Sequence, residues 1–160
     1  MRPIRHRQDG HRESRQVPHA LIDTDELDRV WPQPKPVEAL IAISRRNLES
    51  VWTTLSNLGV RRLILCGVMA SIPQSKPWIE DATAGATVTF ERLTADRDVL
   101  ERRLRDREVG SGFEQEMRAS DRAAAFIQHH DPIEMPFVIT DGKSVAAVAE
   151  EVLRVTDWTA

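Results

Sequence analysis

The feature that most constrains the fold is an alternation between short apolar runs and longer segments with helical periodicity. Residues 61–69 (RRLILCGVM) form a continuous apolar run between turn signals, as in a buried strand of a parallel sheet. Residues 37–58 before this run carry apolar side chains at three- and four-residue steps, which predicts an amphipathic helix that Gly59 ends. Further strands are predicted at 19–23, 87–93 and 136–140, and further helices at 96–108, 114–130 and 144–155.

Strands that alternate with helices are typical of parallel βαβ units with helices on both faces of the sheet. We therefore expect an α/β domain over residues 17–160, with three layers (α/β/α) around a parallel sheet. Residues 1–16 are polar, basic and without an apolar pattern, so we expect them to be disordered and to supply no central strand. Residues 71–85 are predicted to be a loop with about one helical turn.

Composition excludes several classes of protein. The chain has 160 residues and a formal net charge of -3, which gives no reason to expect nucleic-acid binding. A single cysteine, Cys66, rules out an intramolecular disulfide framework, and its apolar setting favours a core position over a nucleophile. No stretch reaches the length of a membrane span, and the first residues have no apolar core of a secretory signal. A cytoplasmic protein without a membrane partner is therefore expected.

Two carboxylates follow the first predicted strand. Asp23 and Asp25 are two residues apart, so in an extended segment they face the same way. Two carboxylates at a strand end suit a Mg²⁺ position together with a base for a substrate hydroxyl. The alternative is that Asp25 only caps the turn that follows.

Basic residues offer a second set of candidates. Arg103 and Arg107 are four residues apart and share a helical face, where guanidinium groups can hold phosphate or stack on a purine. The alternative is a solvated charged helix, and the same alternative is favoured for Arg46 in the middle of its helix. The run His129-His130-Asp131 resembles a metal cluster, but histidines at a helix end favour the helix dipole without any metal.

Taken in order, the segments resemble a known family, the P-loop small-molecule kinases that include shikimate, gluconate and adenylylsulfate kinases. LIDTDEL resembles their second strand, and RNLESVWTTLSNLGVRRLILCGV resembles the next helix and third strand. VTFERLTADRDVLERRLRDREVGSG resembles their fourth strand and lid, and PFVITDGKSVAAVAEEVL their fifth strand, adenine-side loop and last helix. The resemblance runs from about His19 to Trp158.

The resemblance implies ATP and Mg²⁺ as cofactors and a small hydroxylated molecule as phosphate acceptor, with no nucleic-acid partner. It also implies roles for single residues. These are Asp23 near the Mg²⁺ shell, Asp25 at the acceptor hydroxyl, Arg46 on the acceptor, Arg103 near the adenine, Arg107 on the transferring phosphate, and Asp141, Gly142 and Lys143 along the adenine pocket. Asp23, Asp25, Arg46, Arg103 and Arg107 are expected to converge on one cleft.

One departure from the family is severe. The family begins with an apolar strand and G-x-x-x-x-G-K-S/T, whose N–H groups and Lys hold the phosphates, and these 160 residues contain no such motif. The family's first strand lies between its third and fourth strands. The predicted strands at 61–67 and 87–93 should therefore be separated by a gap or pair only weakly.

The genetic code offers an explanation for the missing motif. Residues 2–10 can be encoded by synonymous codons whose neighbouring reading frame spells G-P-S-A-T-G-K-T. A frameshift with a deletion, or a misplaced gene start, would account for the chain. Two functions remain open. One is an ATP-dependent phosphotransferase that is impaired in this chain, and the other is a non-catalytic remnant or interaction module with a kinase-like fold.

Overall fold

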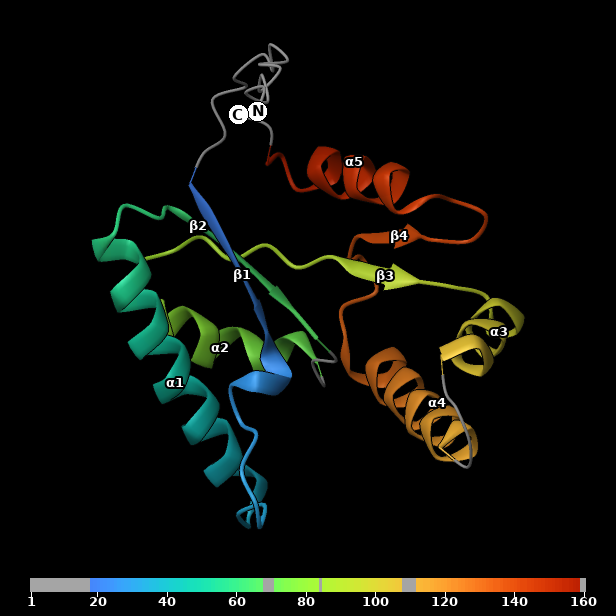
Figure 1. The fold of residues 1–160 in the computed structure, drawn as a ribbon, viewed down its shortest axis with the longest axis horizontal. Helices are drawn as coiled ribbons and strands as arrows, with labels where there is room; N and C mark the ends of the chain where they lie inside the picture. The colour runs from blue at the N-terminus through green and yellow to red at the C-terminus, as the bar shows by residue number, and fades with distance from the viewer. Residues whose placement is uncertain (1–17, 68–70, 84, 108–111, 159–160) are drawn as a thin grey trace, which may run out of the picture.

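The computed structural model describes residues 18–67, 71–83, 85–107 and 112–158. They form a mixed α/β structure, as predicted (Figure 1). Its elements in chain order are β1 (His19–Asp23), the 3-10 turn η1 (Thr24–Glu26), α1 (Val37–Asn57), β2 (Arg62–Cys66), α2 (Ile72–Ala82), β3 (Arg92–Thr94), α3 (Arg97–Arg107), α4 (Phe113–His130), β4 (Phe137–Ile139) and α5 (Val145–Val155). None of the helices in these ranges is long and apolar enough to cross a membrane.

The described strands form two separate parallel pairs. β1 pairs with β2, in a register that runs from His19 opposite Arg62 to Asp23 opposite Cys66. β3 pairs with β4 from Arg92 opposite Phe137. The parallel direction of both pairs agrees with the βαβ reading of the sequence, because each pair is joined by a connection that contains helix.

The separation between the pairs was also predicted. Within the described residues β2 and β3 belong to different sheets, so the expected gap between residues 61–67 and 87–93 is confirmed. The strand predicted at 87–93 is shorter than expected, since only Arg92–Thr94 is hydrogen-bonded as a strand. The physical reason is that a strand requires a neighbour, and β4 reaches only this last part of the segment.

Residues 71–85 correct the sequence analysis, because Ile72–Ala82 is a helix and not a loop. Pro73 lies in the first turn, where its missing N–H would be unpaired in any case. Ser75, Ile79 and Ala82 are buried, and their spacing of four and three residues places them on one helical face. The proline content of the segment concealed this short buried stripe, in which only Ile79 and Ala82 are apolar.

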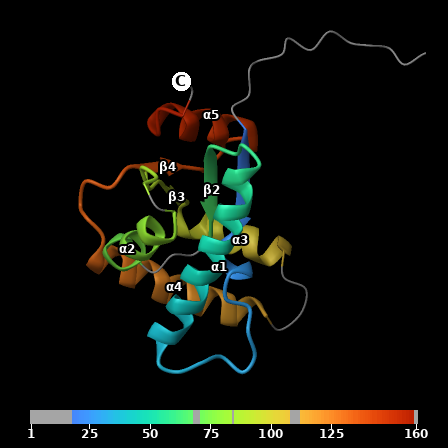
Figure 2. The ribbon, with the colours of Figure 1, turned by 90° about the vertical axis from the view of Figure 1, so that its left-hand side faces the viewer.

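The larger of the two cores lies between the β1–β2 pair and helices α1 and α2. Its buried members are Leu27, Leu48, Ile79 and Ala82, and the partly buried side chains packed on them are Ile22, Leu63, Leu65, Trp78, Val88 and Phe90. Leu21 points to the opposite face of the sheet, because alternate residues face opposite ways, and it is 65% exposed. Helices thus cover only one face of this strand pair, as the two views of the ribbon agree (Figures 1 and 2).

Three further apolar side chains are buried in the second half of the chain. Val138 in the middle of β4 is fully buried, and α5 packs against this strand. Leu104 of α3 and Met117 of α4 are also buried, and these two helices contact each other. The principal contacts between elements therefore fall within each half of the chain.

Truncation of Leu48 tests the position of the larger core. Leu48 has no exposed area, so Leu48→Ala should lower the free energy of unfolding by about 2–5 kcal/mol through lost burial and a residual cavity. The matched control is Leu58→Ala at the end of the same helix, where the side chain is 78% exposed, and its effect should stay within about 0.5 kcal/mol. Urea denaturation followed by circular dichroism measures both values, and equal effects would contradict this core.

Candidate functional site

The acidic pair lies where β1 ends and η1 begins. The Asp23 carboxylate accepts a hydrogen bond from the backbone N–H of Asp25 (3.0 Å), so Asp23 caps the turn. Asp25 was the residue expected to cap the turn in the alternative interpretation, and in the structure Asp23 caps it. The Asp25 side chain is exposed and accepts no hydrogen bond from any described residue, so its carboxylate is available to a ligand.

Gly67 holds this turn close to the end of β2. Its φ is +154°, and a Cβ built there would lie 1.9 Å from Oγ1 of Thr24. Only glycine tolerates that approach, because any side chain would displace η1. The neighbouring Cys66 is opposite Asp23 in the strand register, and its thiol lies 3.7 Å from the carbonyl oxygen of Ile22. Cys66 is exposed, so the expectation of a core position is wrong.

Helix α1 is tied to the segment after η1 by polar contacts near its middle. Asn47 donates through Nδ2 to the carbonyl of Leu27 (2.7 Å), and Ser44 donates to the carboxylate of Asp28 (3.2 Å). Arg46 lies beside these residues with an exposed side chain for which no hydrogen bond or ion pair is found in the described ranges. Arg46 therefore lies on a helix that is held in place by these contacts, and in the described ranges its guanidinium group forms no hydrogen bond or ion pair with another residue.

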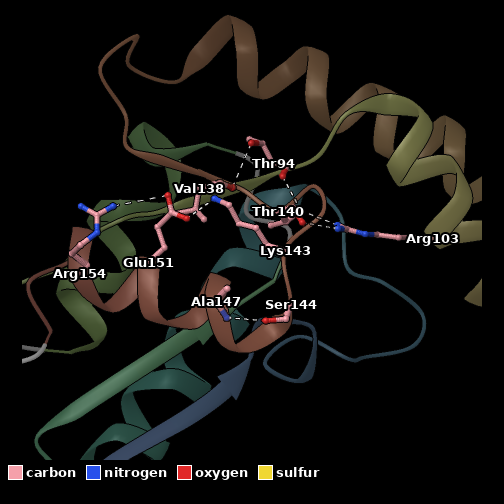
Figure 3. A network of polar contacts seen from close by, with 9 residues as sticks. All are labelled: Thr94, Arg103, Val138, Thr140, Lys143, Ser144, Ala147, Glu151 and Arg154. Carbon is pink, nitrogen blue, oxygen red and sulfur yellow. Dashed lines mark hydrogen bonds and ion pairs between the residues drawn. The ribbon is translucent and has the colours of Figure 1, made fainter.

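Arg103 makes the best-defined contacts among the predicted site residues (Figure 3). Its two terminal nitrogens donate to the hydroxyl and to the carbonyl of Thr140, at 2.8 and 3.0 Å. The Thr140 hydroxyl in turn donates to the carbonyl of Thr94 at 2.9 Å. Thr140 directly follows β4, and Thr94 is the last residue of β3. Arg103 thus connects α3 to the carboxyl ends of two parallel strands, which is the edge where α/β proteins bind ligands.

The loop predicted to line an adenine pocket follows at once. Gly142 has a φ of +66°, so it supplies the left-handed turn after β4. Asp141 accepts a hydrogen bond from the backbone N–H of Asp96 (2.9 Å), which anchors the loop to the start of α3. Lys143 turns the other way and forms an ion pair with Glu151 of α5 (Figure 3). Ser144 caps α5 through the N–H of Ala147 (3.2 Å), as predicted from sequence.

The remaining candidates lie elsewhere. Arg107 forms an ion pair with Glu116 of α4 at 3.7 Å. His130 stacks on Phe126 with ring centroids 4.0 Å apart, and Asp131 binds Arg92 and the N–H of Ile72. Among the described residues no group of three histidine, cysteine or acidic side chains is arranged to hold a metal ion.

The described contacts divide the predicted site into two parts. Arg103 and the 140–143 loop belong to one network at the ends of β3 and β4. Asp23 and Asp25 lie at the end of β1, and in the described ranges no hydrogen bond or ion pair joins them to Arg46, Arg103 or Arg107. The expected convergence of all five residues on one cleft therefore stays a prediction.

Sequence reasoning missed Glu91, which lines a cavity of about 630 Å³ between the two strand pairs. Both carboxylate oxygens are shielded from solvent, and neither has a hydrogen-bond partner among the described residues. Burial raises the pKa of Glu91, and the nearby charge of Glu151 raises it further. The available signal was a charged residue within the predicted strand 87–93, because such a residue is costly to bury without a partner.

Comparison of the chain with models of protein families, with curated proteins and with solved structures finds no significant match. The resemblance to P-loop kinases thus stays a prediction from the segments and their order.

The stability of the protein should report the burial of Glu91. Because its pKa is raised above the ordinary value of 4.5, the folded state holds this proton to higher pH than the unfolded state does. The wild-type chain should therefore lose stability relative to Glu91→Gln as pH rises from 4.5 to about 7. Urea denaturation across this range measures the difference, with Glu49→Gln on the exposed face of α1 as control. A difference that does not change with pH would contradict an unpaired, buried carboxyl.

Proposed function

We propose that this chain is a P-loop small-molecule kinase domain by lineage, an ATP-dependent phosphotransferase for a hydroxylated acceptor, and that it is inactive or nearly so as it stands. In this proposal the complete domain has three layers, and the two strand pairs flank the position of the strand that carries the phosphate loop. The observation that carries the proposal is the network that fixes Arg103 at the carboxyl ends of β3 and β4.

The Arg103 network suits the adenine side of a nucleotide site. A guanidinium group has five N–H donors, and the two hydrogen bonds to Thr140 leave further donors and a planar face for a ligand. The turn at Gly142, two residues after Thr140, is exposed. In this proposal Arg103, Gly142 and Lys143 contact the nucleotide, and Arg107 exchanges Glu116 for the phosphate that is transferred.

The acidic turn suits the acceptor side. Asp23 uses one carboxylate oxygen to cap η1, which leaves the other for a Mg²⁺-bound water or the ion itself. Asp25 is exposed and accepts no described hydrogen bond, as a base for an acceptor hydroxyl requires. Arg46 would hold an anionic part of the acceptor. The bound ion would supply charge neutralisation at the phosphates.

The chain lacks the groups that would bind the phosphates of ATP. No G-x-x-x-x-G-K-S/T motif occurs in the sequence, so the N–H donors and the lysine that cradle the phosphates have no source in these 160 residues. Charge-assisted hydrogen bonds are each worth roughly 1.5–3 kcal/mol, and the loss of several would cost on the order of 5–10 kcal/mol of binding free energy. At about 1.4 kcal/mol per tenfold change in Kd, ATP at millimolar concentration would bind marginally at best.

A second candidate function is a non-catalytic module with a kinase-like fold. The open space between the strand pairs favours it, because this space exposes strand edges that an intact nucleotide-binding sheet would bury.

Isothermal titration with ATP and Mg²⁺ tests the proposal on two proteins. The present chain should give no binding heat, and a chain with an in-frame apolar strand and G-x-x-x-x-G-K-T loop ahead of β1 should bind ATP at micromolar concentration. In the restored protein Arg103→Ala should weaken ATP binding about tenfold, whereas Arg118→Ala on α4 should not. Tight ATP binding by the present chain, or none by a folded restored chain, would refute the proposal.

A further inference from the structure

The cavity between β2 and β3 has the lining of an unfilled strand position. Its apolar walls come from Leu63 and Leu65 of β2 and from Val88 and Phe90 of the segment before β3. All four side chains are only partly buried, although they pack on the larger core. A central strand of a parallel sheet is normally buried on both faces, so these walls lack a neighbour of similar apolar character.

The backbone around the cavity lacks partners as well. No hydrogen bond to the backbone N–H or C=O groups of Thr87–Glu91 is found in the described part of the chain. The exposure of this segment alternates, with Thr87 and Thr89 exposed and Val88 and Phe90 partly buried, which is the period of a strand. Among the described strands, β2 is paired along one edge, to β1. Backbone groups that leave water are almost always paired in proteins, so the open edge of β2 and residues 87–91, which both lack strand partners in the described ranges, mark a place where a strand can add.

Glu91 adds a chemical preference. Its side chain lines the same cavity, and in the part of the chain that the structure describes its carboxylate is shielded from solvent without a hydrogen-bond partner. An unpaired buried carboxylate is costly, and a cationic side chain beside it would remove much of this cost. The basic side chains that line the cavity already contact other residues, although Nε of Arg92 has no partner among the described residues, and Asp157 adds a second, exposed carboxylate to the lining. Arg92 is paired with Asp131, Arg61 bonds to the carbonyls of residues 56 and 60, and Arg62 lies over the ring of Trp158.

We propose that this cavity binds an extended peptide from another molecule, apolar and with one basic residue, that adds as a parallel strand between β2 and residues 87–94. The length of β2, five residues, sets the length of the paired segment at about 16 Å. Main-chain hydrogen bonds to two edges supply the affinity, and the apolar walls and Glu91 supply the selectivity. This inference does not depend on kinase activity, because it involves no nucleotide.

The experiment uses the full chain without nucleotide and a fluorescein-labelled peptide, Ser-Val-Ile-Val-Lys-Val-Ser. The lysine lies late in the peptide because Glu91 lies late in the segment that a parallel strand would follow. Fluorescence anisotropy should rise and saturate at micromolar protein. A peptide with proline in place of the isoleucine should bind at least about tenfold more weakly, because proline removes an N–H and cannot occupy a central strand.

A double-mutant cycle separates the ion pair from general apolar binding. Glu91→Gln should weaken the lysine peptide about fivefold and leave a peptide with threonine in place of lysine unchanged. Glu49→Gln on the exposed face of α1 is the control and should change neither affinity. Circular dichroism of each variant confirms that the fold is intact.

Three results would overturn the proposal. The first is the absence of saturable peptide binding to a folded chain, and the second is equal affinity for the proline peptide. The third is a concentration-dependent dimer that the peptide does not displace, because such a dimer would place a second copy of the chain in the cavity. Sedimentation velocity with and without peptide distinguishes the last case. ATP binding is measured in a separate titration. The peptide-binding result can therefore be interpreted even if the kinase proposal fails.

Discussion

The backbone pairing of parallel strands is the constraint on which the rest of this structure depends. A strand inside a sheet has two edges, and each must be satisfied by a neighbour. β2 and β3 each have one neighbour among the described strands. The position of the cavity, the partial burial of Leu63 and Phe90, and the shortness of β3 all follow from that single deficit.

Much of the fold could be predicted from periodicity. The apolar run that gave β2 and the three- and four-residue steps that gave α1 were located nearly to the residue. The separation of the strand pairs was predicted from the resemblance, because the family's first strand lies at that place and residues 1–16 contain no apolar run to supply it. Helix α2 was missed because its apolar stripe has only a few members and its prolines suggested a loop, although Pro73 falls where a helix tolerates it.

The candidate site was less predictable, because residue type does not fix what a side chain contacts. Asp23 and Asp25 were identified by their spacing, but only the structure shows that Asp23 caps a turn and Asp25 does not. Lys143 was placed beside a nucleotide by resemblance, and it is bound to Glu151 through a contact eight residues along the chain that no motif encodes. Glu91 was missed because its distinctive property is a buried carboxylate without a hydrogen-bond partner among the described residues, and a sequence does not show which partners a side chain lacks.

The partition of contacts into two halves has a thermodynamic consequence. The core around Leu48 and the core around Val138 are joined through residues 85–91 and a few polar links, such as the one from Ile72 to Asp131. Cooperative unfolding requires that unfolding of one core destabilise the other. Two strand pairs that share no hydrogen bonds provide little free-energy coupling of this kind. We therefore expect the amide protons of β2 and β4 to report different opening free energies in hydrogen exchange.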